Sequence, residues 1–81
     1  MNSLSITVID IVAHLEQLKE DTVSSKRLKE KADQVIMLLR SDADLAVEKA
    51  ILQFEELGSS ESSYGRTQIW DVISMLESVK N

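Results

Sequence analysis

Apolar residues recur along this chain at intervals of three or four positions, with polar residues between them. This spacing places the apolar side chains on one face of an α-helix, which turns by about 100° per residue. No segment keeps up the alternation of apolar and polar positions that is typical of a strand. The sequence therefore predicts an all-α protein.

The periodicity predicts four helices, over residues 3–20, 25–40 and 43–57, and from 63–66 to near the last residue. Each predicted helix carries one apolar stripe, as expected for helices packed around a shared core. In chain order the stripes contain Leu4, Val8, Ile11, Val12, Leu15, Leu18, Leu28, Ala32, Val35, Ile36, Leu39, Val47, Ala50, Ile51, Phe54, Leu57, Ile69, Val72, Ile73, Leu76 and Val79.

Small polar residues precede the predicted helices. A serine or aspartate in this position accepts hydrogen bonds from backbone N–H groups that the first helical turn leaves free. The predicted N-caps are Ser3 for the first helix, Ser24 or Ser25 for the second, and Ser41 or Asp42 for the third.

The one clear loop covers residues 58–65, a polar stretch that contains both glycines of the chain. Gly58 is predicted to end the third helix in the left-handed conformation that glycine favours. The other connections are also short, and short connections make consecutive helices antiparallel neighbours. We therefore expect residues 1–81 to form a single domain, an up-and-down four-helix bundle.

Several apolar residues lie off the four stripes. Trp70 is the only tryptophan, and Arg66 precedes it by one turn on the same side, within reach for a cation–π contact. Either some helices pack on two sides, or these residues form a surface that meets another chain. For the second interpretation, the predicted contact residues are Arg66, Trp70, Ile6, Ile9 and Leu52.

The distribution of charge separates two classes of partner. Nine basic and fourteen acidic residues give a formal net charge of −5, which argues against nucleic acid as a general partner. Four cations nevertheless gather at the start of the second predicted helix, where they oppose the helix dipole. Either nearby carboxylates pair with them, or they contact an anion or RNA through Lys26, Arg27, Lys29 and Lys31.

Residues suited to catalysis or metal binding are sparse. The chain has no cysteine, which excludes disulfides, thiolate ligands and cysteine nucleophiles. Its one histidine, His14, has a single carboxylate one turn away, on Asp10, and this is too few ligands for a metal site. No Gly-x-Ser-x-Gly turn and no glycine-rich phosphate loop occur. We therefore expect no enzymatic activity, no metal, no cofactor and no small-molecule substrate.

The chain also lacks the patterns of membrane or secreted proteins. No apolar run approaches the roughly 20 residues that span a bilayer, and no basic region followed by a long apolar run opens the sequence. The absence of cysteine leaves the redox compartment undetermined and fits a cytosolic protein. We expect a cytoplasmic protein with no membrane contact.

A run near the C-terminus contains Arg66-Thr67, Ile69-Trp70, Ile73-Ser74 and Leu76-Glu77. Together with Glu20-Asp21-Thr22-Val23, Asp44-Leu45-Ala46-Val47 and Glu55-Glu56-Leu57, this run resembles an archaeal group, Uncharacterised Protein Family 0147. Ser24 and Tyr64-Gly65 stand where proteins of that family have proline. The resemblance implies a small four-helix bundle from an archaeal cytosol, with no assigned activity.

These observations lead to one main hypothesis and one alternative. The main hypothesis is a non-enzymatic helical module that binds another protein, or a second copy of itself, through the off-stripe apolar residues. The alternative is an accessory factor that touches RNA or a ribonucleoprotein through the basic run of the second helix.

Overall fold

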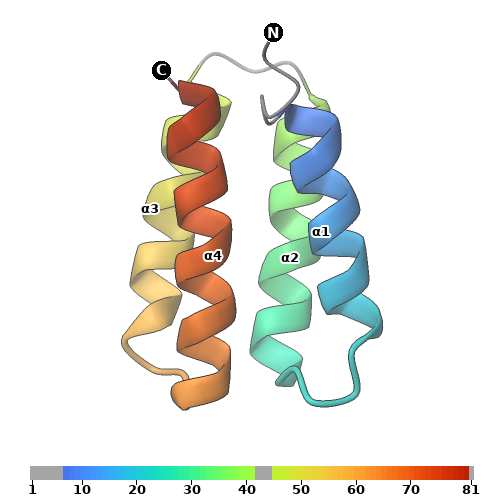
Figure 1. The fold of residues 1–81 in the computed structure, drawn as a ribbon, viewed down its shortest axis with the longest axis vertical. Helices are drawn as coiled ribbons and strands as arrows, with labels where there is room; N and C mark the ends of the chain where they lie inside the picture. The colour runs from blue at the N-terminus through green and yellow to red at the C-terminus, as the bar shows by residue number, and fades with distance from the viewer. Residues whose placement is uncertain (1–6, 42–44, 81) are drawn as a thin grey trace, which may run out of the picture.

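The computed structural model describes residues 7–41 and 45–80, and these residues form four helices (Figure 1). The helices are α1 (Val8–Glu20), α2 (Lys26–Arg40), α3 (Ala46–Gly58) and α4 (Ser63–Lys80). The described residues contain no strand. The all-α prediction is confirmed.

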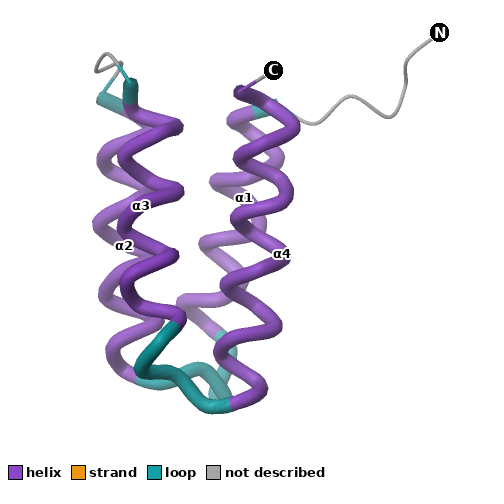
Figure 2. Tube along the Cα trace, turned by 90° about the vertical axis from the view of Figure 1, so that its left-hand side faces the viewer, coloured by secondary structure: helices purple, strands orange, loops and turns teal. Residues whose placement is uncertain are grey.

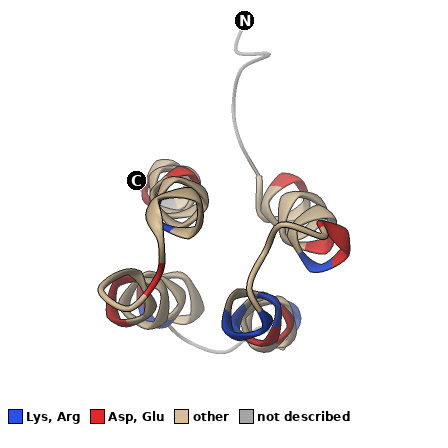
Figure 3. Cartoon of the chain, turned by 90° about the horizontal axis from the view of Figure 1, so that it is seen from below, with Lys and Arg blue, Asp and Glu red and all other residues tan. Residues whose placement is uncertain are grey.

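Consecutive helices run in opposite directions and pack side by side. α1 packs against α2 and α4, and α3 packs against α2 and α4, so the four helices surround one core (Figure 3). The α1–α2 and α3–α4 connections lie together at one end of the bundle, as Figure 2 shows. The chain is therefore an up-and-down four-helix bundle, as the periodicity predicts.

The core consists of the predicted stripes. Phe54 is the largest of its fully buried side chains, and Ile11, Leu28 and Ile69 are also inaccessible to solvent. Val8, Val12, Val47 and Val79 are partly buried and pack at the edge of this core. Leu4 lies outside the described residues. Periodic burial thus accounts for how each helix is turned toward the others.

The start of α1 differs from the prediction. The helix begins at Val8 with Thr7 as its N-cap, and Ser3 lies outside the described residues. The backbone N–H of Asp10 donates to Thr7 Oγ1 at 3.3 Å, and Thr7 N–H donates to Asp10 Oδ2 at 3.0 Å. These two hydrogen bonds form a capping box.

The start of α2 is as predicted, because Ser25 Oγ accepts a hydrogen bond from the N–H of Leu28 at 3.1 Å. The prediction for α3 is wrong at Ser41, which ends α2 and donates its hydroxyl to the carbonyl of Leu38 at 2.7 Å. Asp42 lies outside the described residues. α3 instead follows Leu45, whose φ of 61° is left-handed and whose side chain makes no capping bond.

The predicted left-handed stop at Gly58 is also wrong. Gly58 is the last residue of α3, and neither glycine has a positive φ. The loop that follows begins at Ser59, which is in the right-handed region with a φ of −69°. Hydroxyl groups complete this helix end, since Ser60 Oγ donates to the carbonyl of Leu57 at 3.0 Å.

Candidate functional site

Trp70 lies on the outer side of the bundle between α3 and α4. Its side chain is 56% exposed and borders a hollow of about 260 Å³. Phe54 and Ile69 belong to the buried core and form the base of this hollow. Its lining residues are Phe54, Glu55, Gly58, Ser59, Arg66, Ile69 and Trp70.

Arg66 and Trp70 come together at this hollow, as the helical spacing predicts. Arg66 Nε donates to the backbone carbonyl of Glu61 at 3.3 Å, so the guanidinium is directed toward the α3–α4 connection. This hydrogen bond fixes Arg66 at the end of the hollow nearest the start of α4.

A second hollow of about 340 Å³ lies further along the same two helices. Its lining residues are Glu48, Ile51, Leu52, Glu55 and Glu77. Glu55 lines both hollows, and we call the two together the α3–α4 groove. Leu52 is 59% exposed and adds a second exposed apolar side chain to the groove, after Trp70.

The remaining predicted contact residues lie elsewhere. Ile9 is 80% exposed on the first turn of α1, a helix that packs against α2 and α4. Ile6 lies outside the described residues. Two further apolar residues also lie off the four stripes: Met37 is exposed on α2, and Met75 packs against the core. The off-stripe residues therefore do not form one patch, and Leu52, Arg66 and Trp70 are the predicted residues that the fold brings to a common groove.

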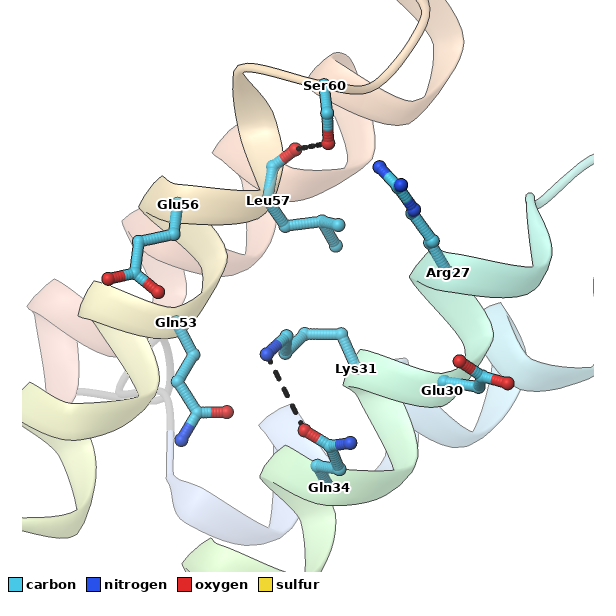
Figure 4. Close-up of a pocket in the computed structure, with 8 residues that line it drawn as sticks. All are labelled: Arg27, Glu30, Lys31, Gln34, Gln53, Glu56, Leu57 and Ser60. Atoms are coloured by element: carbon cyan, nitrogen blue, oxygen red, sulfur yellow. Dashed lines mark hydrogen bonds between the residues drawn. The ribbon is translucent and has the colours of Figure 1, made fainter.

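The basic residues gather at the near end of α2 in Figure 3, but they divide between two faces of that helix. Lys26 and Lys29 line a hollow on α2 together with Glu30, Asp33 and Gln34. Arg27 and Lys31, four positions apart, instead face α3 across a hollow of about 310 Å³ (Figure 4). Its lining residues are Arg27, Glu30, Lys31, Gln34, Gln53, Glu56, Leu57 and Ser60.

Among the described side chains, none of these four cations forms an ion pair with a carboxylate. Asp33, one of the carboxylates near this basic run, instead pairs with Lys19 of α1 at 2.8 Å. That hydrogen bond raises the pKa of Lys19. Lys31 Nζ reaches the side-chain oxygen of Gln34 at 3.5 Å (Figure 4). The hollow that it faces also contains Glu30 and Glu56, so its lining carries both signs of charge.

A polar cluster that the sequence analysis missed joins the two connections at one end of the bundle. Ser25 Oγ donates to the carboxylate of Glu61, with oxygen distances of 2.9 and 3.0 Å. The hydroxyl of Tyr64 donates to Asp21, which also accepts the N–H of Val23 at 3.0 Å. Donation from Tyr64, and then from Val23, lowers the pKa of Asp21, and the same contact raises the pKa of Tyr64.

A metal site needs several histidine, cysteine, aspartate or glutamate side chains at one place. The described residues contain no group of three or more of these side chains placed to hold a metal ion. Nε2 of His14 is buried and has no hydrogen-bond partner among the described atoms. Within the same residues, no helix has the length and apolar character needed to cross a membrane.

Comparison of the chain with protein-family models, with curated proteins and with solved structures finds no match.

Proposed function

We propose that this protein is a non-enzymatic binding module that holds a partner protein in the α3–α4 groove. The observation that carries the proposal is the exposure of Trp70. This large apolar side chain is more than half exposed and lies beside a hollow that the core residues Phe54 and Ile69 also line. Tryptophan and arginine are the side chains most enriched among residues that dominate binding energy at protein interfaces. Trp70 and Arg66 line the same hollow.

The composition of the groove supports the same conclusion. Leu52 extends the apolar surface beyond Trp70, while Glu55 and Arg66 supply polar groups around it. An apolar centre with a polar rim is the usual anatomy of a protein interface. The segment that carries Arg66 and Trp70 is one of those that resemble Uncharacterised Protein Family 0147. Membership of that family, with an archaeal cytoplasm as the setting, is part of the proposal.

The test uses tagged full-length protein to capture partners from extract of the source cells, with mass spectrometry to identify them. We expect a partner that survives nuclease treatment, is lost with Trp70→Ala and is kept with Met37→Ala, which removes an apolar side chain of similar exposure from α2. The same partner captured equally by both variants would contradict the proposal. Sedimentation of the protein alone shows whether the partner is a second copy of this chain.

A second candidate function is contact with RNA through the basic run of α2. The observation that favours it is that Arg27 and Lys31 point toward one hollow and pair with no described carboxylate (Figure 4). Phosphate contacts of this kind weaken as salt increases, because binding releases counterions. We would measure RNA binding at two salt concentrations, for the wild-type protein and for a variant with the charges of Arg27 and Lys31 reversed. An RNA affinity that changes neither with salt nor with charge reversal would contradict this candidate.

A further inference from the structure

The α3–α4 groove has an acidic rim. Glu48, Glu55 and Glu77 line it, and Arg66 is the only cation among its described lining residues. None of the three carboxylates forms an ion pair with a described side chain. Arg66 lies at the end of the groove and is directed toward the carbonyl of Glu61. The groove therefore presents an excess of negative charge beside its apolar side chains.

The spacing of these residues gives the groove a direction. Glu48 and Glu55 are seven positions apart on α3, and Trp70 and Glu77 are seven positions apart on α4. Seven residues are two helical turns, or about 10 Å of helix. Because α3 and α4 are antiparallel, Trp70 lies level with Glu55 and Glu77 lies level with Glu48. Apolar side chains and carboxylates thus run together along two turns of both helices.

We infer that the segment held in the α3–α4 groove is a basic amphipathic helix of the partner protein. The inference rests on the proposed function, because it names the chemistry of the partner for the same groove. A depression between two packed helices accepts a third helix, whose apolar residues at intervals of three or four positions enter the groove. Lysine or arginine residues beside that apolar stripe face Glu48, Glu55 and Glu77.

Charge complementarity selects this occupant over an acidic or neutral one. An acidic helix would bring like charges to the groove, and like-charge contact at an interface is unfavourable. A neutral helix would leave the carboxylates facing an apolar surface without partners. The exposed position of the rim means that added salt screens the attraction.

The test titrates the full-length protein with two synthetic helical peptides that share one leucine pattern. One peptide carries lysine and the other carries glutamate at the flanking positions, and neither contains tryptophan. Trp70 is the only tryptophan of the protein, so a shift of its fluorescence to shorter wavelength reports burial in the groove directly. We expect a saturable shift with the lysine peptide, weaker binding at high salt, and no shift with the glutamate peptide.

Matched neutralisations separate the groove from the net charge of the whole protein. We expect Glu55→Gln with Glu77→Gln to weaken binding of the lysine peptide roughly five- to tenfold, since each exposed charge pair contributes modestly. Glu20→Gln with Glu30→Gln changes the net charge equally on α1 and α2 and should leave the affinity within about twofold of the wild-type value. Equal weakening by both pairs, or equal binding of both peptides, would overturn the inference.

Failure of this inference differs from failure of the proposed function. If Trp70→Ala abolishes capture of the partner but Glu55→Gln with Glu77→Gln leaves the amount captured unchanged, the groove binds protein and the occupant is not basic. If Trp70→Ala changes neither capture nor the affinity for the lysine peptide, measured for this variant by calorimetry because it has no tryptophan, the groove is not the binding site.

Discussion

Glu61 links parts of the chain that are far apart in sequence. Its carboxylate accepts hydrogen bonds from Ser25, which caps α2, and its backbone carbonyl accepts one from Arg66 of α4. A carboxylate next to the start of α2 also complements the positive end of that helix dipole, and the first turn of α2 has no acidic residue of its own. Glu61 therefore stabilises the bundle end and holds Arg66 beside the groove.

The contact between Glu61 and Gly65 gives the first prediction. A Cβ added at Gly65 would overlap Oε1 of Glu61 and would lie 3.0 Å from Cβ of the same residue, so the Glu61 side chain would have to shift. We expect Gly65→Ala to lower the free energy of unfolding by about 1–2 kcal/mol, because Glu61 must move away from Ser25. Gly58→Ala is the control: its added Cβ would lie 3.7 Å from Ile69, and replacing a helical glycine should raise stability by about 0.5–1 kcal/mol. Urea denaturation measures both, and equal effects would contradict the role of the Glu61 contact.

The hydrogen bond between Tyr64 and Asp21 gives the second prediction. It lowers the pKa of Asp21 in the folded protein, so its contribution to stability is present above the ordinary aspartate pKa of 3.8 and is lost as the pH falls through the lower folded value. Tyr64→Phe removes the hydroxyl donor and should move the pKa of Asp21 upward. NMR titration of the Asp21 carboxyl measures this change, and an unaltered pKa would show that the hydroxyl does not donate to it in solution.

At the scale of the helices, the sequence predicts the buried faces much better than the ends. The stripe from Leu28 to Leu39 predicts its own burial, because the hydrophobic effect acts on many side chains at once. A helix end depends on only one or two hydrogen bonds, so its position is harder to predict. The cap of α1 is formed by Thr7 with Asp10, although the sequence predicts it at Ser3. Gly58 stays helical because the hydroxyls of the loop serines accommodate the end of α3.

The candidate groove could be predicted only in part, for a related reason. Trp70 and Leu52 are visibly off their stripes, but their meeting in one groove depends on the antiparallel alignment of α3 and α4. Ile9 has the same pattern in sequence and lies away from the groove. The contact between Ser25 and Glu61 joins residues 36 positions apart, and no local spacing predicts it.

The start of α3 gives the third prediction. Leu45 has a φ of 61° and is 63% exposed, so it holds a left-handed conformation with little burial to offset the strain. Asparagine tolerates this conformation better than leucine does, so Leu45→Asn should raise the free energy of unfolding by roughly 0.5–1 kcal/mol. The control is Leu52→Asn, an equally exposed leucine inside α3, which should lower stability slightly through helix propensity. Urea denaturation measures the free energy of unfolding of both variants. A lower value for Leu45→Asn than for the wild type would mean that the left-handed conformation of Leu45 is not strained.

At the scale of the whole molecule, folding and binding use different side chains of the same two helices. Phe54 is fully buried and its truncation leaves a cavity, so Phe54→Ala should cost about 3–5 kcal/mol. This loss is a large part of the roughly 5–15 kcal/mol that stabilises a typical domain, and we expect a greatly lowered melting temperature. Trp70 is 56% exposed, so Trp70→Ala should change stability by no more than about 1 kcal/mol.

Thermal unfolding followed by circular dichroism compares the two variants under one set of conditions. A small effect of Trp70→Ala means that any loss of partner capture in this variant reflects the missing contact, because the bundle is intact. If Trp70→Ala lowers the melting temperature as much as Phe54→Ala does, Trp70 is part of the core. Its exposed position beside the groove would then be no argument for binding. Since Arg66, Trp70 and Phe54 line one hollow, this comparison separates a surface that binds a partner from a side chain that only completes the bundle.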